Sequence, residues 1–161
     1  MAVHKLVLDD VFEEALFTLI AIHCTIEDYR LAYLLNKHLG INLVRKPLDL
    51  DYNNGKSTYS IFEWEDNKLL TKWNLVSNIC KTQETPKSNQ QSLFSTQQQI
   101  TKTFNLIPEH KGVNYFLKID NDNNFRKEAY ILSAILNIPQ VVTAFNVDVN
   151  QLKSKDNLIF S

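Results

Sequence analysis

The sequence predicts an α+β domain in which a mixed, mainly antiparallel sheet is built around a central three-stranded meander and flanked by two strand-helix-strand units. Three observations predict this architecture. Apolar and polar residues alternate on both sides of an Asn-Gly pair, two separate segments carry apolar residues at helical spacing, and each of these segments ends at a residue that stops helices. With 161 residues, of which 44% are hydrophobic, the chain suits a single domain spanning residues 1–161.

The first strand-helix-strand unit begins with an apolar segment. Leu16 to Cys24 is nearly all apolar, and periodicity alone does not separate a buried strand from a helix there. The length and the β-branched residues of this segment favour a strand, with a helix as the alternative. A short alternating stretch from His4 to Asp9 predicts a further strand before it.

A helix is predicted after this strand. Thr25 and Asp28 have the spacing of a capping box, with Asp in place of the usual Glu. Gly40 is suited to the left-handed conformation that ends a helix. The apolar stripe between the two ends consists of Leu31, Leu35 and Leu39.

The central meander is predicted from two tight turns. Asn54-Gly55 is a strong hairpin signal because its turn needs positive φ at both central residues. Pairing about this turn places Tyr52 opposite Ser57, Leu50 opposite Tyr59 and Leu48 opposite Ile61. A second turn at Asn67-Lys68 places Glu63 opposite Lys72 and Phe62 opposite Trp73, which pairs opposite charges on one face and aromatic residues on the other.

The middle strand of this meander carries apolar residues on both faces. Tyr59 and Ile61 lie on one face, whereas Phe62 and Trp64 lie on the other. A helix can cover one of these faces. The other face must therefore meet a second helix, the polar segment that follows, or another chain.

A polar segment over residues 81–106 separates the meander from the second unit. Its Gln-, Ser- and Thr-rich composition predicts a long connection or a poorly anchored helix. Beyond it we expect a strand over Val113–Ile119, a turn over Asn121–Asn124, a helix over Phe125–Leu136 that ends at a left-handed Asn137, and a strand over Val141–Val149. Shifted by 97 positions, Ile22–Val44 matches Ile119–Val141 at seven positions, which suggests two similar units, although common core residues also match by chance.

Composition and charge exclude several functions. The three glycines stand too far apart to form a phosphate-binding loop, and 17 basic against 18 acidic residues make a poor binder of duplex DNA. The two cysteines have no CxxC partner, and Asp120–Asn124 lacks the Gly and Glu of a calcium loop, so we expect no cofactor and no metal site. The N-terminal residues do not form a signal peptide and the apolar runs are short, which predicts a cytoplasmic protein with no membrane partner.

The segment IPEHKGVNY is the most distinctive motif in the chain. Pro108 restricts Ile107 to an extended conformation. Glu109 and His110 are the only adjacent carboxylate and imidazole in the chain, which are groups that acid–base catalysis uses. The expected role of the motif is nevertheless a structural corner or a contact point for a partner. We call residues 107–115 the IPE corner.

The IPE corner resembles the motif of the IPExxxVDY family, a group of small uncharacterised proteins of the Bacteroidota. The matching residues are Ile107, Pro108, Glu109, Val113 and Tyr115, with Asn114 where the family has Asp. The DYRLAYLLN run, Asp28–Asn36, is also similar to that family's helix. The resemblance covers most of the chain and brings with it no assigned activity, cofactor or substrate.

These observations favour a non-enzymatic cytoplasmic module that binds another protein or a second copy of itself. The expected binding surface combines the second apolar face of the meander with the IPE corner and consists of Tyr59, Ile61, Ile107, Pro108, Glu109, His110 and Tyr115. The alternative is an RNA-associated accessory factor that uses Lys68, Lys72 and Lys111 together with exposed aromatic residues. A third hypothesis is an enzyme in which Glu109 and His110 act together.

Overall fold

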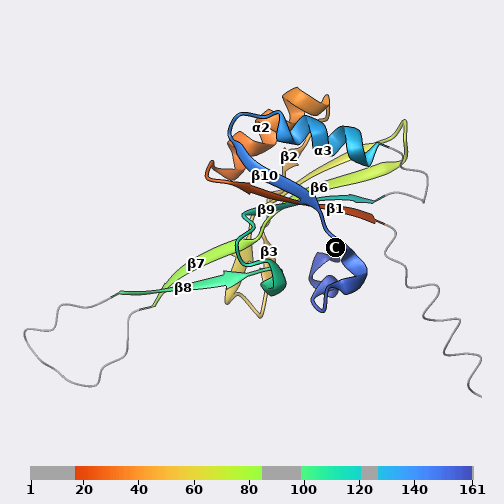
Figure 1. Ribbon diagram of the computed structural model, residues 1–161. Helices are drawn as coiled ribbons and strands as arrows, with labels where there is room; N and C mark the ends of the chain where they lie inside the picture. The colour runs from red at the N-terminus through yellow and green to blue at the C-terminus, as the bar shows by residue number, and fades with distance from the viewer. Residues whose placement is uncertain (1–16, 85–98, 121–126, 161) are drawn as a thin grey trace, which may run out of the picture.

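The computed structural model describes residues 17–84, 99–120 and 127–160. It shows an α+β architecture with a six-stranded sheet in the order β10-β1-β9-β6-β5-β2, and every pairing between the described strands is antiparallel (Figure 1). The predicted α+β class is therefore confirmed, whereas the described strands form antiparallel pairs throughout and not the mixed sheet that was expected. The strands are β1 (Phe17–Cys24), β2 (Val44–Arg45), β3 (Leu50–Tyr52), β4 (Ser57–Tyr59), β5 (Ile61–Asp66), β6 (Thr71–Ser77), β7 (Ile79–Glu84), β8 (Ile100–Asn105), β9 (Tyr115–Asp120) and β10 (Val141–Asn146). The helices are α2 (Asp28–Leu39) and α3 (Glu128–Leu136), with short 3₁₀ helices η1 (Pro108–His110), η2 (Val149–Gln151) and η3 (Lys155–Leu158).

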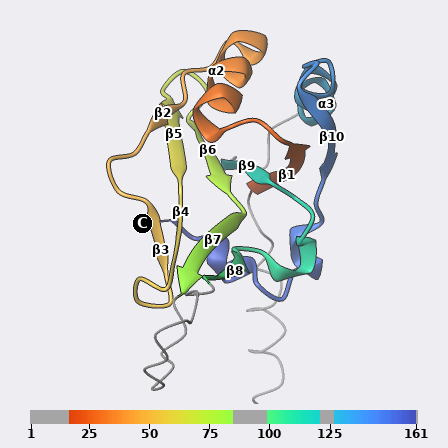
Figure 2. The ribbon, with the colours of Figure 1, turned by 90° about the vertical axis from the view of Figure 1, so that its left-hand side faces the viewer.

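The large sheet is covered on both faces. Helices α2 and α3 lie side by side on one face, whereas β7, β8 and the C-terminal 3₁₀ segment lie on the opposite side (Figure 2). Side chains from the helix-covered face form the first core, which includes Ile20, Ile22, Leu31, Leu35, Leu75, Leu117, Ile119, Ile131 and Ile135. The other face forms the second core, which includes Leu19, Ala21, Tyr59, Ile61, Val76, Leu106, Ile107, Phe116, Val149, Leu152 and Leu158.

Burial on both faces explains the continuous apolar run at Phe17–Cys24. Ile20 and Ile22 point into the first core, and Leu19 and Ala21 point into the second. The segment is a strand between β9 and β10, as favoured from its length and β-branched content, and the helical alternative is excluded.

Of the predicted helix ends, one is confirmed and two are wrong. Gly40 ends α2 in the left-handed conformation, with φ of 65°, as predicted. The expected capping box does not form, because the helix begins at Asp28 and Thr25 lies two residues before the N-cap position. The predicted left-handed Asn137 is also wrong, since its φ is −79°. The last turn of α3 tightens instead, and the N–H of Ile138 donates to the carbonyl of Ile135.

The first hairpin has the predicted register, but the meander is divided. Tyr52 pairs with Ser57 and Leu50 with Tyr59 across a loop in which Asn53, Asn54 and Gly55 all have positive φ. The expected pair between Leu48 and Ile61 is absent because the middle strand breaks at Ser60: β4 pairs with β3, whereas β5 enters the large sheet beside β2 and β6. Leu48 is 81% exposed as a result.

The register predicted for the second turn is wrong by two residues. Trp64 pairs with Trp73 and Glu63 with Asn74, so the loop has four residues, 67–70, instead of two. The carboxylate of Asp66 accepts hydrogen bonds from the N–H groups of the loop, and Leu70 takes a positive φ of 51°. A shift of two residues preserves the faces, so the aromatic residues of β5 still point toward the helices.

The polar segment is not a simple connection. Its ends form β7 and β8, which pair from Ile79 opposite Asn105 to Glu84 opposite Ile100. The strand expected over His4–Asp9 and the turn expected over Asn121–Asn124 lie outside the described residues. The two predicted strand-helix-strand units correspond in order to β1-α2-β2 and β9-α3-β10. No helix in the described part of the chain combines the length and the apolar character needed to span a lipid bilayer.

The chain's own C-terminal segment covers the sheet face that sequence reasoning left open. Leu152 and Leu158 are buried in the second core beside Tyr59 and Ile61. The ammonium group of Lys118, on β9, donates a hydrogen bond of 2.8 Å to the carbonyl of Leu158. The same ammonium lies 4.7 Å from the ring centre of Phe17 and 4.9 Å from that of Phe160.

Candidate functional site

The IPE corner is organised by one buried asparagine. The side-chain oxygen of Asn78 accepts a 2.8 Å hydrogen bond from the N–H of Ile107, and its amide nitrogen donates to the carbonyls of His110 and Val113, each at 2.8 Å. Its backbone bonds to Asn114 and Leu106 at 2.9 Å. Asn78 is fully buried, and both polar atoms of its side chain have hydrogen-bond partners.

The second half of the IPE corner attaches β9 to the end of β1. The side-chain oxygen of Asn114 accepts a 3.1 Å hydrogen bond from the N–H of Cys24. The hydroxyl of Tyr115 donates to the carbonyl of Ile26 at 2.8 Å, and burial raises the pKa of this hydroxyl. An aspartate at position 114 would offer the same acceptor oxygen, so the Asn in this chain fits a structural contact.

Glu109 attaches the corner to the C-terminal segment. Its carboxylate accepts hydrogen bonds from the hydroxyl of Ser154 at 2.8 Å and from its N–H at 3.2 Å. A second contact joins the same elements, because the side-chain amide of Asn157 donates to the carbonyl of Leu106 at 2.8 Å. Glu109 therefore helps to hold the C-terminal segment in place over the second core.

His110 packs against aromatic rings. Its ring centre lies 6.2 Å from that of Phe116 in an edge-on arrangement and 5.9 Å from that of Phe145 on β10. Pro108 is exposed beside it at the first position of η1. The structure therefore gives Glu109 and His110 different partners and does not bring them together as an acid–base pair.

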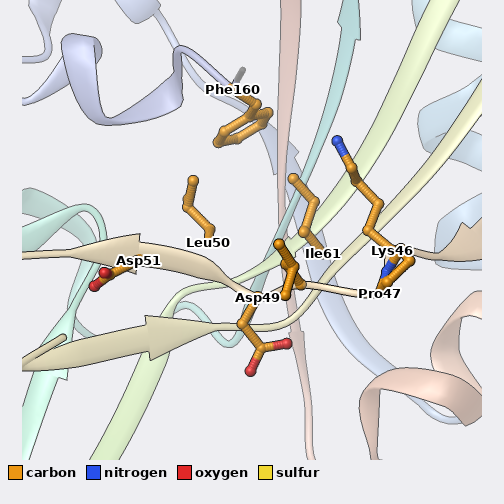
Figure 3. A pocket seen from close by; sticks show the side chains of 8 residues that line it. Lys46, Pro47, Asp49, Leu50, Asp51, Ile61 and Phe160 are labelled. Carbon is orange, nitrogen blue, oxygen red and sulfur yellow. The ribbon is translucent and has the colours of Figure 1, made fainter.

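The remaining predicted site residues are covered. Tyr59, Ile61 and Ile107 are each at most 3% exposed, so none offers its side chain to a partner in the folded chain. Ile61 lines a cavity of about 460 Å³ between β3, β5 and Phe160 (Figure 3). The cavity walls are Lys46, Pro47, Leu48, Asp49, Leu50, Asp51, Ile61 and Phe160. Asp49 is paired with Arg45, and Asp51 accepts a hydrogen bond from the N–H of Gly55.

Glu63 is the centre of a charge cluster on β5. Its carboxylate lies 3.2 Å from the ammonium of Lys46, 3.4 Å from that of Lys72 and 3.3 Å from the amide nitrogen of Asn74. Burial is the largest single influence and raises its pKa, but the hydrogen bonds and the two positive charges together outweigh burial and lower it. Among the described residues, no three His, Cys, Asp or Glu side chains gather as metal ligands.

We expect acid to destabilise the protein through Glu63 and Glu109, whose pKa values are both lowered in the folded state. Burial raises the pKa of Glu109, but the hydrogen bonds to its carboxylate, chiefly those from Ser154, outweigh burial and lower the pKa. Because the unfolded chain then binds more protons at low pH, the stability these groups contribute is present above their ordinary pKa of 4.5 and is lost as pH falls through the folded values. Urea unfolding between about pH 7 and pH 3 should show a flatter pH dependence for the double variant E63Q/E109Q than for the natural chain. An unchanged slope would contradict the assignment.

The two edges of the large sheet differ in how they meet solvent. At one edge, β2 has only two residues, carries Arg45 and is followed by Lys46 and Pro47. Short length, positive charge and proline are the features by which natural sheets prevent further strands from pairing. This edge is therefore protected.

At the opposite edge, β10 has six residues, VVTAFN, and carries neither charge nor proline. Among the strands that the structure describes, it pairs only with β1. Val142 is 67% exposed and Phe145 is 39% exposed. A bulge beside Val142 shifts the register at the start of the strand, and the pairing is regular from Thr143 onward. This edge, together with the adjacent His110, is the surface that we describe as the open β10 edge.

Alternation of the hydrogen bonds defines which groups the open β10 edge presents. The N–H of Val147 donates to the carbonyl of Leu19 at 2.9 Å, and the carbonyl of Ile22 points the other way, toward Asn114. In an antiparallel pair, alternate residues bond inward and outward. Ala144 and Asn146 therefore direct their N–H and C=O groups away from β1.

The sequence pattern indicated the IPE corner and the strand at β10, but it revealed neither the role of Asn78 nor the position of β10 at an open edge. A lone Asn between a strand and a polar segment carries no local pattern that marks it as buried. The signal for β10 was available in the uncharged VVTAFN run, but only the strand order shows that this run lies at an edge. Comparison with known proteins finds no match among protein-family profiles, curated protein sequences or solved structures.

Proposed function

We propose that this chain is a non-enzymatic protein-binding module that accepts an extended strand at the open β10 edge. The observation that carries the proposal is the difference between the two edges of one sheet: β2 is short and basic, whereas β10 is long and uncharged. An added strand would meet the four outward N–H and C=O groups of Ala144 and Asn146. We further propose that it does so in the cytoplasm, in keeping with the sequence.

The IPE corner supports this edge in the proposal. Asn78 and Glu109 fix η1, and η1 places the ring of His110 against Phe145 on β10. The motif that resembles that of the IPExxxVDY family would then stabilise the fold beside the edge that binds a partner strand. The resemblance to that family is itself part of the proposal.

The contacts of the lysines argue against the RNA-binding alternative. Lys72 is paired with Glu63. Lys68 lies next to the β6 end that pairs with Asp120, whereas Lys111 precedes Tyr115, which pairs with Ser77 at the other end of β6. The three lysines therefore do not form one basic surface of the kind that follows a phosphate backbone.

Strand addition is tested by the substitution Asn146→Pro, with Asn146→Ala as the matched control. Proline removes an N–H that points outward and leaves the ladder to β1 intact, because edge strands accept proline at outward positions. The natural chain is used to select binders from a displayed library of random twelve-residue peptides. We expect selected peptides to bind N146A as tightly as the natural chain and N146P about tenfold more weakly. Peptides that bind N146P and N146A equally would contradict the proposal, as would a selection that yields none.

A further inference from the structure

We infer that the strand added at the open β10 edge is β10 of a second copy of this chain, so that two six-stranded sheets join into one across a two-fold axis; this inference rests on the proposed function. An antiparallel strand pair is related by such an axis, and a two-fold interface uses the same surface of both copies. The strand must therefore complement itself in hydrogen bonding, in charge and in side-chain size.

The hydrogen-bonding groups of β10 are self-complementary. The outward-facing residues are Ala144 and Asn146, and they lie symmetrically about Phe145. With the two-fold axis at Phe145, Ala144 of one copy lies opposite Asn146 of the other, and each such pair exchanges two hydrogen bonds. The axis uses every outward group of the regular part of the strand. It also sets the small Ala144 opposite the larger Asn146, on the helix-covered face.

Charge also permits the strand to pair with itself. Like charges placed directly opposite one another oppose strand pairing, and β10 carries no charged side chain. The nearest acidic residue along the chain, Asp148, would lie opposite the uncharged Val142 of the second copy in this register. The β2 edge would instead bring Arg45 and Lys46 close to their own copies.

The aromatic residues beside β10 favour the same register. The axis places the two Phe145 side chains directly opposite each other in a non-hydrogen-bonded pair, where side chains of adjacent strands come closest. Phe145 is the partly exposed end of a row that continues through His110 to the buried Phe116. Pairing two copies joins these rows into one continuous aromatic row and covers the exposed part of Phe145.

The test places opposite charges at position 145, on the two-fold axis. Phe145→Glu and Phe145→Lys are each examined alone and as an equal mixture by sedimentation velocity, beside the natural chain. We expect the natural chain to form a dimer, each variant alone to associate at least tenfold more weakly because like charges meet, and the mixture to regain association. The pair N146P and N146A adds a backbone test, in which N146P removes two hydrogen bonds per dimer and weakens association about tenfold or more. Circular dichroism and urea unfolding verify that each variant is folded.

Several outcomes would overturn the inference. A natural chain that stays monomeric at about 1 mM would do so, as would a Phe145→Glu variant that still dimerises, or a charge-exchanged mixture that stays monomeric while the natural chain dimerises. If the natural chain is monomeric but still binds selected peptides in a manner that N146P weakens, strand addition stands and only the second copy is rejected. If it is monomeric and no selected peptide depends on Asn146, the proposed function also fails.

Discussion

Replacing Asn78 with alanine is expected to lower the free energy of unfolding by about 3–5 kcal/mol, although the residue lies in no helix or strand. Two buried groups would lose their partners at once, the N–H of Ile107 and the carbonyl of Val113, and the carbonyl of His110 would keep only its bond from the N–H of Val113. A buried polar group without a partner costs about 1–3 kcal/mol, which makes this loss larger than that of an ordinary hydrogen bond. Urea unfolding followed by tryptophan fluorescence measures it.

Two further variants make this test specific. Asn78→Asp keeps the size and the acceptor but sets a carboxylate oxygen against two carbonyl oxygens, so it should destabilise the chain about as strongly as alanine. Asn137→Ala removes an exposed Asn at the end of α3 and should change stability by less than about 0.5 kcal/mol. If Asn78→Ala were as mild as Asn137→Ala, the IPE corner would not depend on Asn78.

The second large effect is expected from two phenylalanines that contact the same histidine. Phe116 is fully buried in the second core, and Phe116→Ala should cost about 3–5 kcal/mol of folding stability through lost burial and a cavity. Phe145 also contacts His110 but is partly exposed at the sheet edge, so Phe145→Ala should cost about 1 kcal/mol or less. The same substitution should weaken binding at the edge by about fivefold or more.

These two variants separate folding from binding at one contact. Urea unfolding at low protein concentration gives the stability of each, and sedimentation or peptide titration gives the binding. We expect opposite patterns: a large loss of stability for F116A, and a loss confined to binding for F145A. Equal stability losses for both variants, with unchanged binding for F145A, would place Phe145 in the core and not at an interface.

Much of the fold follows from local pattern, and the exceptions have physical causes. The strand at Phe17–Cys24, the left-handed Gly40 and the first hairpin each depend on residues close in sequence, and the structure confirms them. The second turn depended on whether Asp66 would accept hydrogen bonds from its own loop, which lengthened that loop by two residues. At Ser60 the chain leaves the small sheet, in which β4 pairs with β3, and enters the large sheet as β5. No local sequence pattern marks this point.

Less of the candidate site than of the fold could be predicted from the sequence. The motif at the IPE corner stood out, but its role depends on Asn78 and Ser154, which lie 29 and 47 positions from Ile107. The apolar pattern at Tyr59 and Ile61 correctly indicated a second covered face. It could not distinguish a partner from the chain's own C-terminal segment, because both bury apolar residues equally well.

The central claim is that β10 presents open backbone groups to an incoming strand, and residue-resolved amide hydrogen exchange by NMR tests it most directly. The amides of Ala144 and Asn146 face outward at this edge. At the other edge, Lys46 bonds to Ile61, so the amide of Arg45 faces outward and serves as the internal control. When a strand binds, from a second copy or from a selected peptide, the account predicts exchange at Ala144 and Asn146 at least about tenfold slower and no change at Arg45. Binding that leaves Ala144 and Asn146 unchanged, or that protects Arg45 instead, would contradict it.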